Sequence, residues 1–187
     1  MKTLTYTLLL CIIAALAVSC ASPGKPKARD IPDFYLNPPT SEEMIYGVGD
    51  ANMTSLSMSR TTALSRARDD IARQVELVVK SAVTDYAQQA GAGRTEQTIN
   101  FTETVSRQLV EVTLRGLRTV EVSLGKDGTV YALVEYSLSD FRSEAEGIFQ
   151  RNQDAAFAEF KASQALEQLN YELSNNPPRA GEPRAGE

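Results

Sequence analysis

The chain has 187 residues and a formal net charge of -5, from 19 Lys and Arg against 24 Asp and Glu. This mild acidity argues against nucleic acid or an anionic lipid surface as the main partner. The sequence contains no histidine, which excludes every catalytic triad, zinc site and general-base scheme that depends on an imidazole.

The first residues are typical of a bacterial export signal. Met1 and Lys2 precede an apolar run from Leu8 to Val18, which as a helix is about half as long as a bilayer core requires. The run ends at Ala17-Val18-Ser19-Cys20, which is similar to a bacterial lipobox, although Ala17 stands where leucine is usual. We predict that residues 1–19 are a signal peptide and that acylated Cys20 attaches the mature protein to the bilayer. Plain secretion with a free Cys20 thiol is the alternative.

Short linkers are expected at both ends of the mature chain. Cys11 leaves with the signal, so an acylated protein has no thiol left for a disulfide, a metal or covalent catalysis. Residues 20–30 are small, basic and proline-containing, which is typical of a lipid-anchored tether. Residues 175–187 contain the pentapeptide PRAGE twice and are predicted to be disordered. Residues 31–174 between them are expected to form a single domain.

The first half of this domain is predicted to contain one strand and two helices. Ile31–Tyr35 is expected to be extended because of its proline, and Ile45–Gly49 to be a short strand. From about Ser55 to Tyr86, apolar residues recur every three or four positions, which predicts a long amphipathic helix. The spacing of a capping box at Asn100–Glu103 predicts the start of a second helix, which Gly116 ends.

A hairpin and a third helix complete the pattern. Apolar and polar residues alternate over 119–124 and again over 130–136, on either side of a turn at Lys126–Gly128. Ser139 is expected to cap a helix from about Asp140 to Leu173, which would be ~51 Å long. A domain of this size cannot cover such a helix, so its distal half is expected to project or to pack on a partner.

The order strand, two helices, hairpin, helix predicts an α+β fold. A small antiparallel three-stranded sheet would be covered by the long helices, with an extended C-terminal helix beyond them.

Two motifs that resemble chemical sites have simpler structural interpretations. The adjacent acids Asp69 and Asp70 have arginines within one helical turn, so an ion-paired, solvated helix face is expected rather than an acid/base pair. Gly47-Val48-Gly49 lacks the third glycine of a dinucleotide fingerprint, so these glycines are expected to permit close helix packing. We therefore predict no catalytic residue, no metal site and no cofactor.

Two groups of residues are candidates for contact with a ligand or a partner. The aromatic residues near the domain entrance either line a ligand groove at the sheet edge or staple the N-terminal arm over the core. The leucines of the last predicted helix are candidates for an interface. The two groups are Phe34, Tyr35 and Tyr46, and Leu166, Leu169 and Leu173.

Four motifs of the chain have counterparts in a known family. They are PDFY at 32–35, YGVGDA at 46–51, ALSRAR at 63–68 and YALV at 131–134. The stretch from Pro32 to Phe141 that contains them resembles the lipoprotein-20 family of Helicobacter-type outer-membrane lipoproteins. The resemblance implies an envelope protein with a dodecin-like helix-on-sheet domain. The family distantly includes a flagellar lipoprotein that builds rings or disks around motors, which implies a role in assembly.

The function predicted from the sequence is that of a non-enzymatic outer-membrane lipoprotein, facing the periplasm or the cell surface. Its partners would be the lipid bilayer, through Cys20, and either further copies of itself or another envelope protein. Ala21 favours the outer membrane, because the aspartate that signals inner-membrane retention in enteric bacteria is absent. The alternative is a module that binds a lipid or small hydrophobic ligand in an apolar groove between the sheet and the first long helix.

Overall fold

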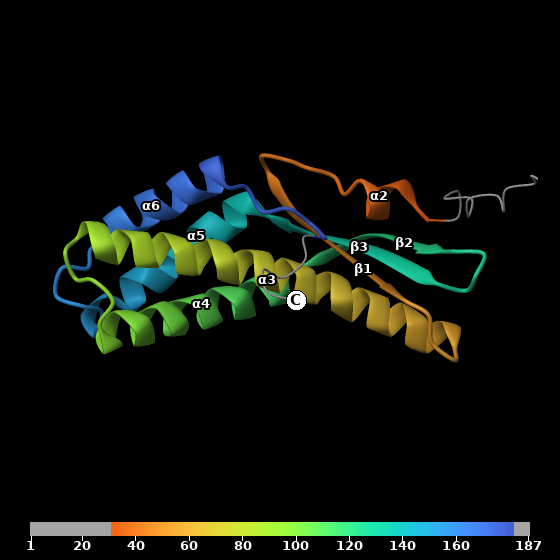
Figure 1. Cartoon of the computed structure of the whole chain (residues 1–187), viewed down its shortest axis with the longest axis horizontal. Helices are drawn as coiled ribbons and strands as arrows, with labels where there is room; N and C mark the ends of the chain where they lie inside the picture. The colour runs from red at the N-terminus through yellow and green to blue at the C-terminus, as the bar shows by residue number, and fades with distance from the viewer. Residues whose placement is uncertain (1–30, 182–187) are drawn as a thin grey trace, which may run out of the picture. The chain divides into compact units, whose positions relative to one another are not determined.

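The structure, a computed structural model, describes residues 31–181. These residues form a three-stranded sheet with helices packed on it and beyond one end of it (Figure 1). The elements in chain order are α2 (Asp33–Leu36), β1 (Met44–Ala51), α3 (Leu56–Gln89), α4 (Glu96–Gly116), β2 (Arg118–Leu124), β3 (Val130–Ser137), α5 (Leu138–Arg151), the short 3-10 helix η2 (Gln153–Ala155) and α6 (Ala162–Asn175). The predicted α+β class is confirmed, whereas the signal peptide and Cys20 lie outside the described residues.

The sheet is antiparallel, with β3 between β1 and β2. At one end of it Val130 of β3 pairs with Ala51 of β1 on one side and with Leu124 of β2 on the other. The β2–β3 register shifts between Thr119 and Glu121, which leaves an extra residue on β2. The predicted hairpin is confirmed, and within residues 31–181 the outer edges of β1 and β2 have no strand partner.

Helix α3 packs closely on β1 because two glycines remove the side chains between them. A Cβ atom on Gly47 would lie 2.3 Å from the carbonyl oxygen of Ala67, and one on Gly49 would lie 2.4 Å from the carbonyl oxygen of Ala63. These distances confirm that the glycines permit close helix packing. They leave no space for a ligand between α3 and β1 at these two positions.

Helix α4 begins earlier than predicted. Thr95 is its N-cap, and Thr95 and Thr98 form a reciprocal capping box through side chains and backbone amides. The predicted box at Asn100–Glu103 lies inside the helix, because the earlier threonine pair already satisfies the first amides. The predicted end at Gly116 is confirmed.

The predicted single helix from Asp140 to Leu173 is wrong. Helix α5 ends at Arg151, where Asn152 caps it and donates from its side chain to the carbonyl oxygen of Ile148 at 2.8 Å. The chain then turns back, and α6 packs on both α3 and α5. The turn buries Phe157 and Phe160 in an aromatic cluster, and the Phe160 ring lies 4.6 Å from that of Phe101. Folding back covers the apolar face that a straight helix would leave in water.

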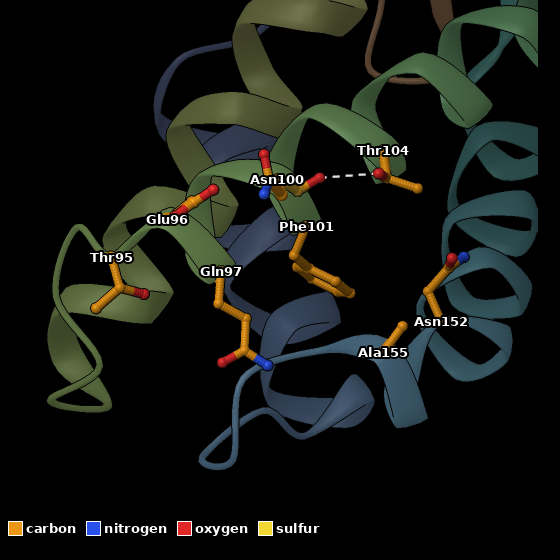
Figure 2. Close-up of a pocket in the computed structure, with 8 residues that line it drawn as sticks. All are labelled: Thr95, Glu96, Gln97, Asn100, Phe101, Thr104, Asn152 and Ala155. Carbon is orange, nitrogen blue, oxygen red and sulfur yellow. Dashed lines mark hydrogen bonds between the residues drawn. The ribbon is translucent and has the colours of Figure 1, made fainter.

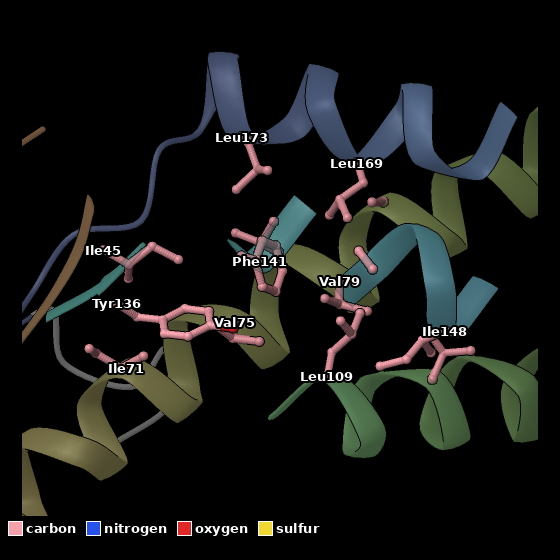
Figure 3. Packing of buried hydrophobic residues seen from close by; sticks show 14 of the residues in the cluster. Ile45, Ile71, Val75, Val79, Leu109, Tyr136, Phe141, Ile148, Leu169 and Leu173 are labelled. Carbon is pink, nitrogen blue, oxygen red and sulfur yellow. The ribbon is translucent and has the colours of Figure 1, made fainter. Parts of the chain in front are cut away.

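The core therefore lies among α3, α4, α5, α6 and the inner face of the sheet. Figure 3 shows Leu169 and Leu173 of α6 pointing toward Phe141 of α5. The largest fully buried side chains of the core are Phe141, Phe149, Ile45, Ile71, Leu109, Ile148 and Leu169.

Candidate functional site

Side chains of α3 form hydrogen bonds with backbone groups along the outer edge of β1. The side-chain amide of Gln74 donates to the carbonyl oxygen of Tyr46 at 2.8 Å, and Arg66 donates to the carbonyl oxygen of Asp50 at 2.7 Å. Residues four apart on a helix share a face, so one row of α3 side chains can follow the strand edge. Backbone groups that would otherwise be open to another strand are thereby occupied.

Asp70 lies between these two residues on α3. It was predicted to lie on a solvated helix face, and the structure shows it buried. Its side chain is buried, with 2 % exposure, and one carboxylate oxygen accepts from the backbone amides of Val48 at 3.1 Å and Gly181 at 2.8 Å. The other oxygen accepts from Arg73 at 3.0 Å. Asp69 is exposed as expected, but Asp70 is not solvated because it binds the edge of β1 and the C-terminal segment together. The tail predicted to be disordered from residue 175 thus reaches β1 at Gly181.

The N-terminal arm covers the face of the sheet opposite α3. Its predicted extended segment is instead a single helical turn, α2, which begins after Pro32 and is closed by a hydrogen bond from Asn37 to the Asp33 side chain. The Tyr35 ring meets that of Tyr131 edge to face, with 5.0 Å between centroids. The contact favours the staple over the ligand groove for Tyr35.

The hydroxyl of Tyr35 donates to the Asp50 carboxylate at 2.7 Å. Burial of the phenol is the main cause that raises the pKa of Tyr35 to about 12, with a further contribution from this hydrogen bond. Phe34 and Tyr46 are half-buried, and the structure places all three aromatic residues on the arm or on β1.

The three leucines proposed as an interface lie on α6. Leu169 and Leu173 are buried, and Leu166 is half-buried against the core. Their side chains complete the intramolecular core in the folded-back arrangement. In this fold Leu169 and Leu173 have little surface left for a partner, whereas Leu166 stays partly exposed.

Strand β2 forms an exposed surface that the sequence analysis did not predict. Apart from minor contacts, β2 packs only on β3 among the described elements, whereas α3 packs on both β1 and β3. Most β2 residues are exposed, and the exposed fraction is 48 % for Val120 and 58 % for Leu124. Alternation of apolar and polar residues predicted the strand but cannot show that no helix lies over it.

An open hollow of about 640 Å³ lies between the start of α4 and the turn after α5. Figure 2 shows its floor at Phe101 and a rim of polar side chains. The Gln97 amide on this rim donates to the carbonyl oxygen of Ala156 at 2.9 Å, and the Asn152 side chain donates to Gln108 at 3.0 Å. These amides hold α4 against the turn after α5, so a structural role accounts for them.

Residues 31–181 contain no group of three or more His, Cys, Asp or Glu side chains that could hold a metal ion. No helix in the same part of the chain is long and apolar enough to cross a bilayer.

The comparisons with known proteins identify one family. The model of the LPP20 lipoprotein family matches residues 32–137, more than half of the chain. The matched region runs from α2 to the end of β3 and leaves out α5 and α6. No curated protein and no solved structure gives a significant match.

Proposed function

Because the chain belongs to the LPP20 lipoprotein family, we propose that it is an outer-membrane lipoprotein, tethered through acylated Cys20, whose domain acts by contact with further copies of itself. The proposed role is structural and non-enzymatic. It fits the envelope-assembly and flagellar roles that the family resemblance implies.

The observation that carries this proposal is the difference between the two edges of the sheet. On β1, three side chains of α3 bind backbone groups of the edge. On β2, no described helix makes comparable contact, and Val120 and Leu124 are both about half exposed. A strand edge that is left open and carries exposed apolar side chains is a natural surface for association.

The contact is expected to involve side chains rather than a continued sheet. The register shift at Val120 bends the edge, and the exposed charged residues Arg118 and Glu121 hinder regular strand addition. A second copy would instead cover Val120 and Leu124 with its own apolar residues. Burying these side chains removes apolar surface from water, which favours association.

A second copy is the partner favoured by the anchor. Two exposed apolar residues make a small patch, whereas a stable interface in solution typically buries about 800 Å² on each partner. Copies that are anchored in one membrane are confined to a surface and share its orientation, which raises their effective concentration. A weak contact can then become populated without a large interface.

The test compares the acylated protein with a Val120→Lys variant in phospholipid vesicles, where the copies share one membrane. A charge on β2 should reduce the energy transfer between copies labelled at the C-terminus with a donor or an acceptor dye, at equal surface density. Leu77→Lys is the matched control, because Leu77 is 70 % exposed on α3 and distant from the proposed surface in sequence and element. Equal energy transfer for the wild type and Val120→Lys would contradict association through β2.

A further inference from the structure

A second apolar surface lies at the loop after β1 and the first turn of α3. Its side chains are Met53, Leu56 and Met58, and the exposed fraction reaches 60 % for Leu56 and 57 % for Met58. We call residues 52–58 the apolar loop. No charged residue occurs in it, and its other members are Asn, Thr and Ser. The nearest charged residues along the chain are Asp50 and Arg60, which lie outside the loop.

Hydrogen bonds hold the apolar loop in place. The Asn52 side chain donates to the carbonyl oxygen of Asp127 at 3.2 Å, which fixes the loop beside the β2–β3 turn. The backbone amide of Met53 donates to Ser59 at 2.9 Å, and Ser55 caps α3 by accepting from the amide of Met58. The apolar side chains are therefore presented to solvent by a fixed backbone.

The tether enters the domain at the same end. Tyr35 of α2 contacts Asp50 and Tyr131, which directly adjoin the strand ends Ala51 and Val130. The apolar loop begins immediately after Ala51. In Figure 1, α2 accordingly lies over the sheet, and its contacts are with β3 and β1.

The length of the tether limits how far this end can lie from the membrane. Ile31 follows Cys20 by eleven residues. A chain of that length cannot exceed about 40 Å even when fully extended. An acyl anchor at Cys20 therefore holds Ile31, where the chain enters the domain, within that distance of the bilayer.

We propose that the apolar loop contacts the lipid surface, with Met53, Leu56 and Met58 inserted at the boundary between head groups and acyl chains. The inference rests on the acylation of Cys20 in the proposed function. Apolar side chains gain free energy at this boundary, and the uncharged loop carries no ionised group into it. The contact would add a second attachment to the acyl anchor and would fix which end of the domain faces the membrane.

The experiment uses the absence of tryptophan from the chain. A single tryptophan is introduced as Leu56→Trp in the acylated full chain, with Met58→Trp as a second probe and Leu77→Trp as the control. Each protein is reconstituted in phosphatidylcholine vesicles with or without a lipid that carries a nitroxide quencher at a shallow acyl position. Flotation of the vesicles measures the attachment of the protein independently.

We expect quenching of Leu56→Trp and Met58→Trp to exceed that of Leu77→Trp at least twofold, with emission shifted to the blue. Protein that floats with the vesicles but shows equal quenching at the three positions would overturn the lipid contact and leave the anchor intact. Protein that does not float would overturn the anchor and the contact with it.

Discussion

The two edges of the sheet are formed by strands of similar length, but they differ in whether other parts of the chain cover them. β1 is followed by a helix whose side chains Arg66, Asp70 and Gln74 bind its backbone, and the C-terminal segment reaches the same place through Gly181. β2 follows the end of α4 and receives no such cover from the helices in the described part of the chain. The comparison shows that an open edge is a local property: the same domain closes one edge thoroughly and leaves the other exposed.

The largest loss of stability is expected from a substitution at the contact between α3 and β1. Gly47→Ala places a Cβ against the carbonyl oxygen of Ala67, so the helix must move away from the strand and its edge contacts weaken together. The free energy of unfolding should fall by about 3 kcal/mol, measured by urea denaturation. Gly147→Ala is the control, since an added Cβ there meets only the end of the Arg151 side chain. Equal losses would contradict the close packing of α3 on β1.

The closed edge should also depend on one carboxylate. Asp70→Ala leaves the amides of Val48 and Gly181 without their acceptor, which should lower the free energy of unfolding by about 2 kcal/mol. Hydrogen exchange at both amides should become faster. Asp69→Ala, at the exposed neighbouring position, is expected to change stability by less than about 0.5 kcal/mol. If hydrogen exchange at the two amides were unchanged in Asp70→Ala, Asp70 would not be what protects the edge of β1.

A smaller effect with a defined pH dependence is expected at the arm over β1. The pKa of Tyr35 is raised to about 12 in the folded state, so the protonated phenol stabilises the fold fully below pH 10. This contribution is lost as the pH rises from about 10 through about 12. Tyr35→Phe should lower the free energy of unfolding by about 1 kcal/mol at neutral pH and by less at pH 11, measured by urea denaturation. A loss that grows with pH would contradict the assigned role of the hydroxyl.

The sequence predicted the strands and the first long helix because each depends on a local pattern. Gly47 and Gly49 in β1, the periodic apolar residues of α3 and the turn after Leu124 indicate these elements without knowledge of distant contacts. The α+β class followed from their order.

The predictions that failed depended on contacts between distant segments. The apolar pattern continues through residues 152–161, and only the packing of Phe157 and Phe160 on Phe101 shows that the chain turns back there. The burial of Asp70 likewise depends on partners 22 and 111 residues away in sequence. The apolar loop did carry a signal, because Met53, Leu56 and Met58 stand isolated among small polar residues at a helix start.

The most direct test of association through β2 is cross-linking in intact cell envelopes. Cys11 leaves with the signal and the Cys20 thiol is consumed by acylation in the proposed protein, so Val120→Cys supplies its one free thiol. Mild oxidation is expected to give a disulfide-linked dimer with Val120→Cys and little or none with Leu77→Cys, which is the more exposed position. Equal cross-linking at the two positions, or none at Val120, would contradict the account.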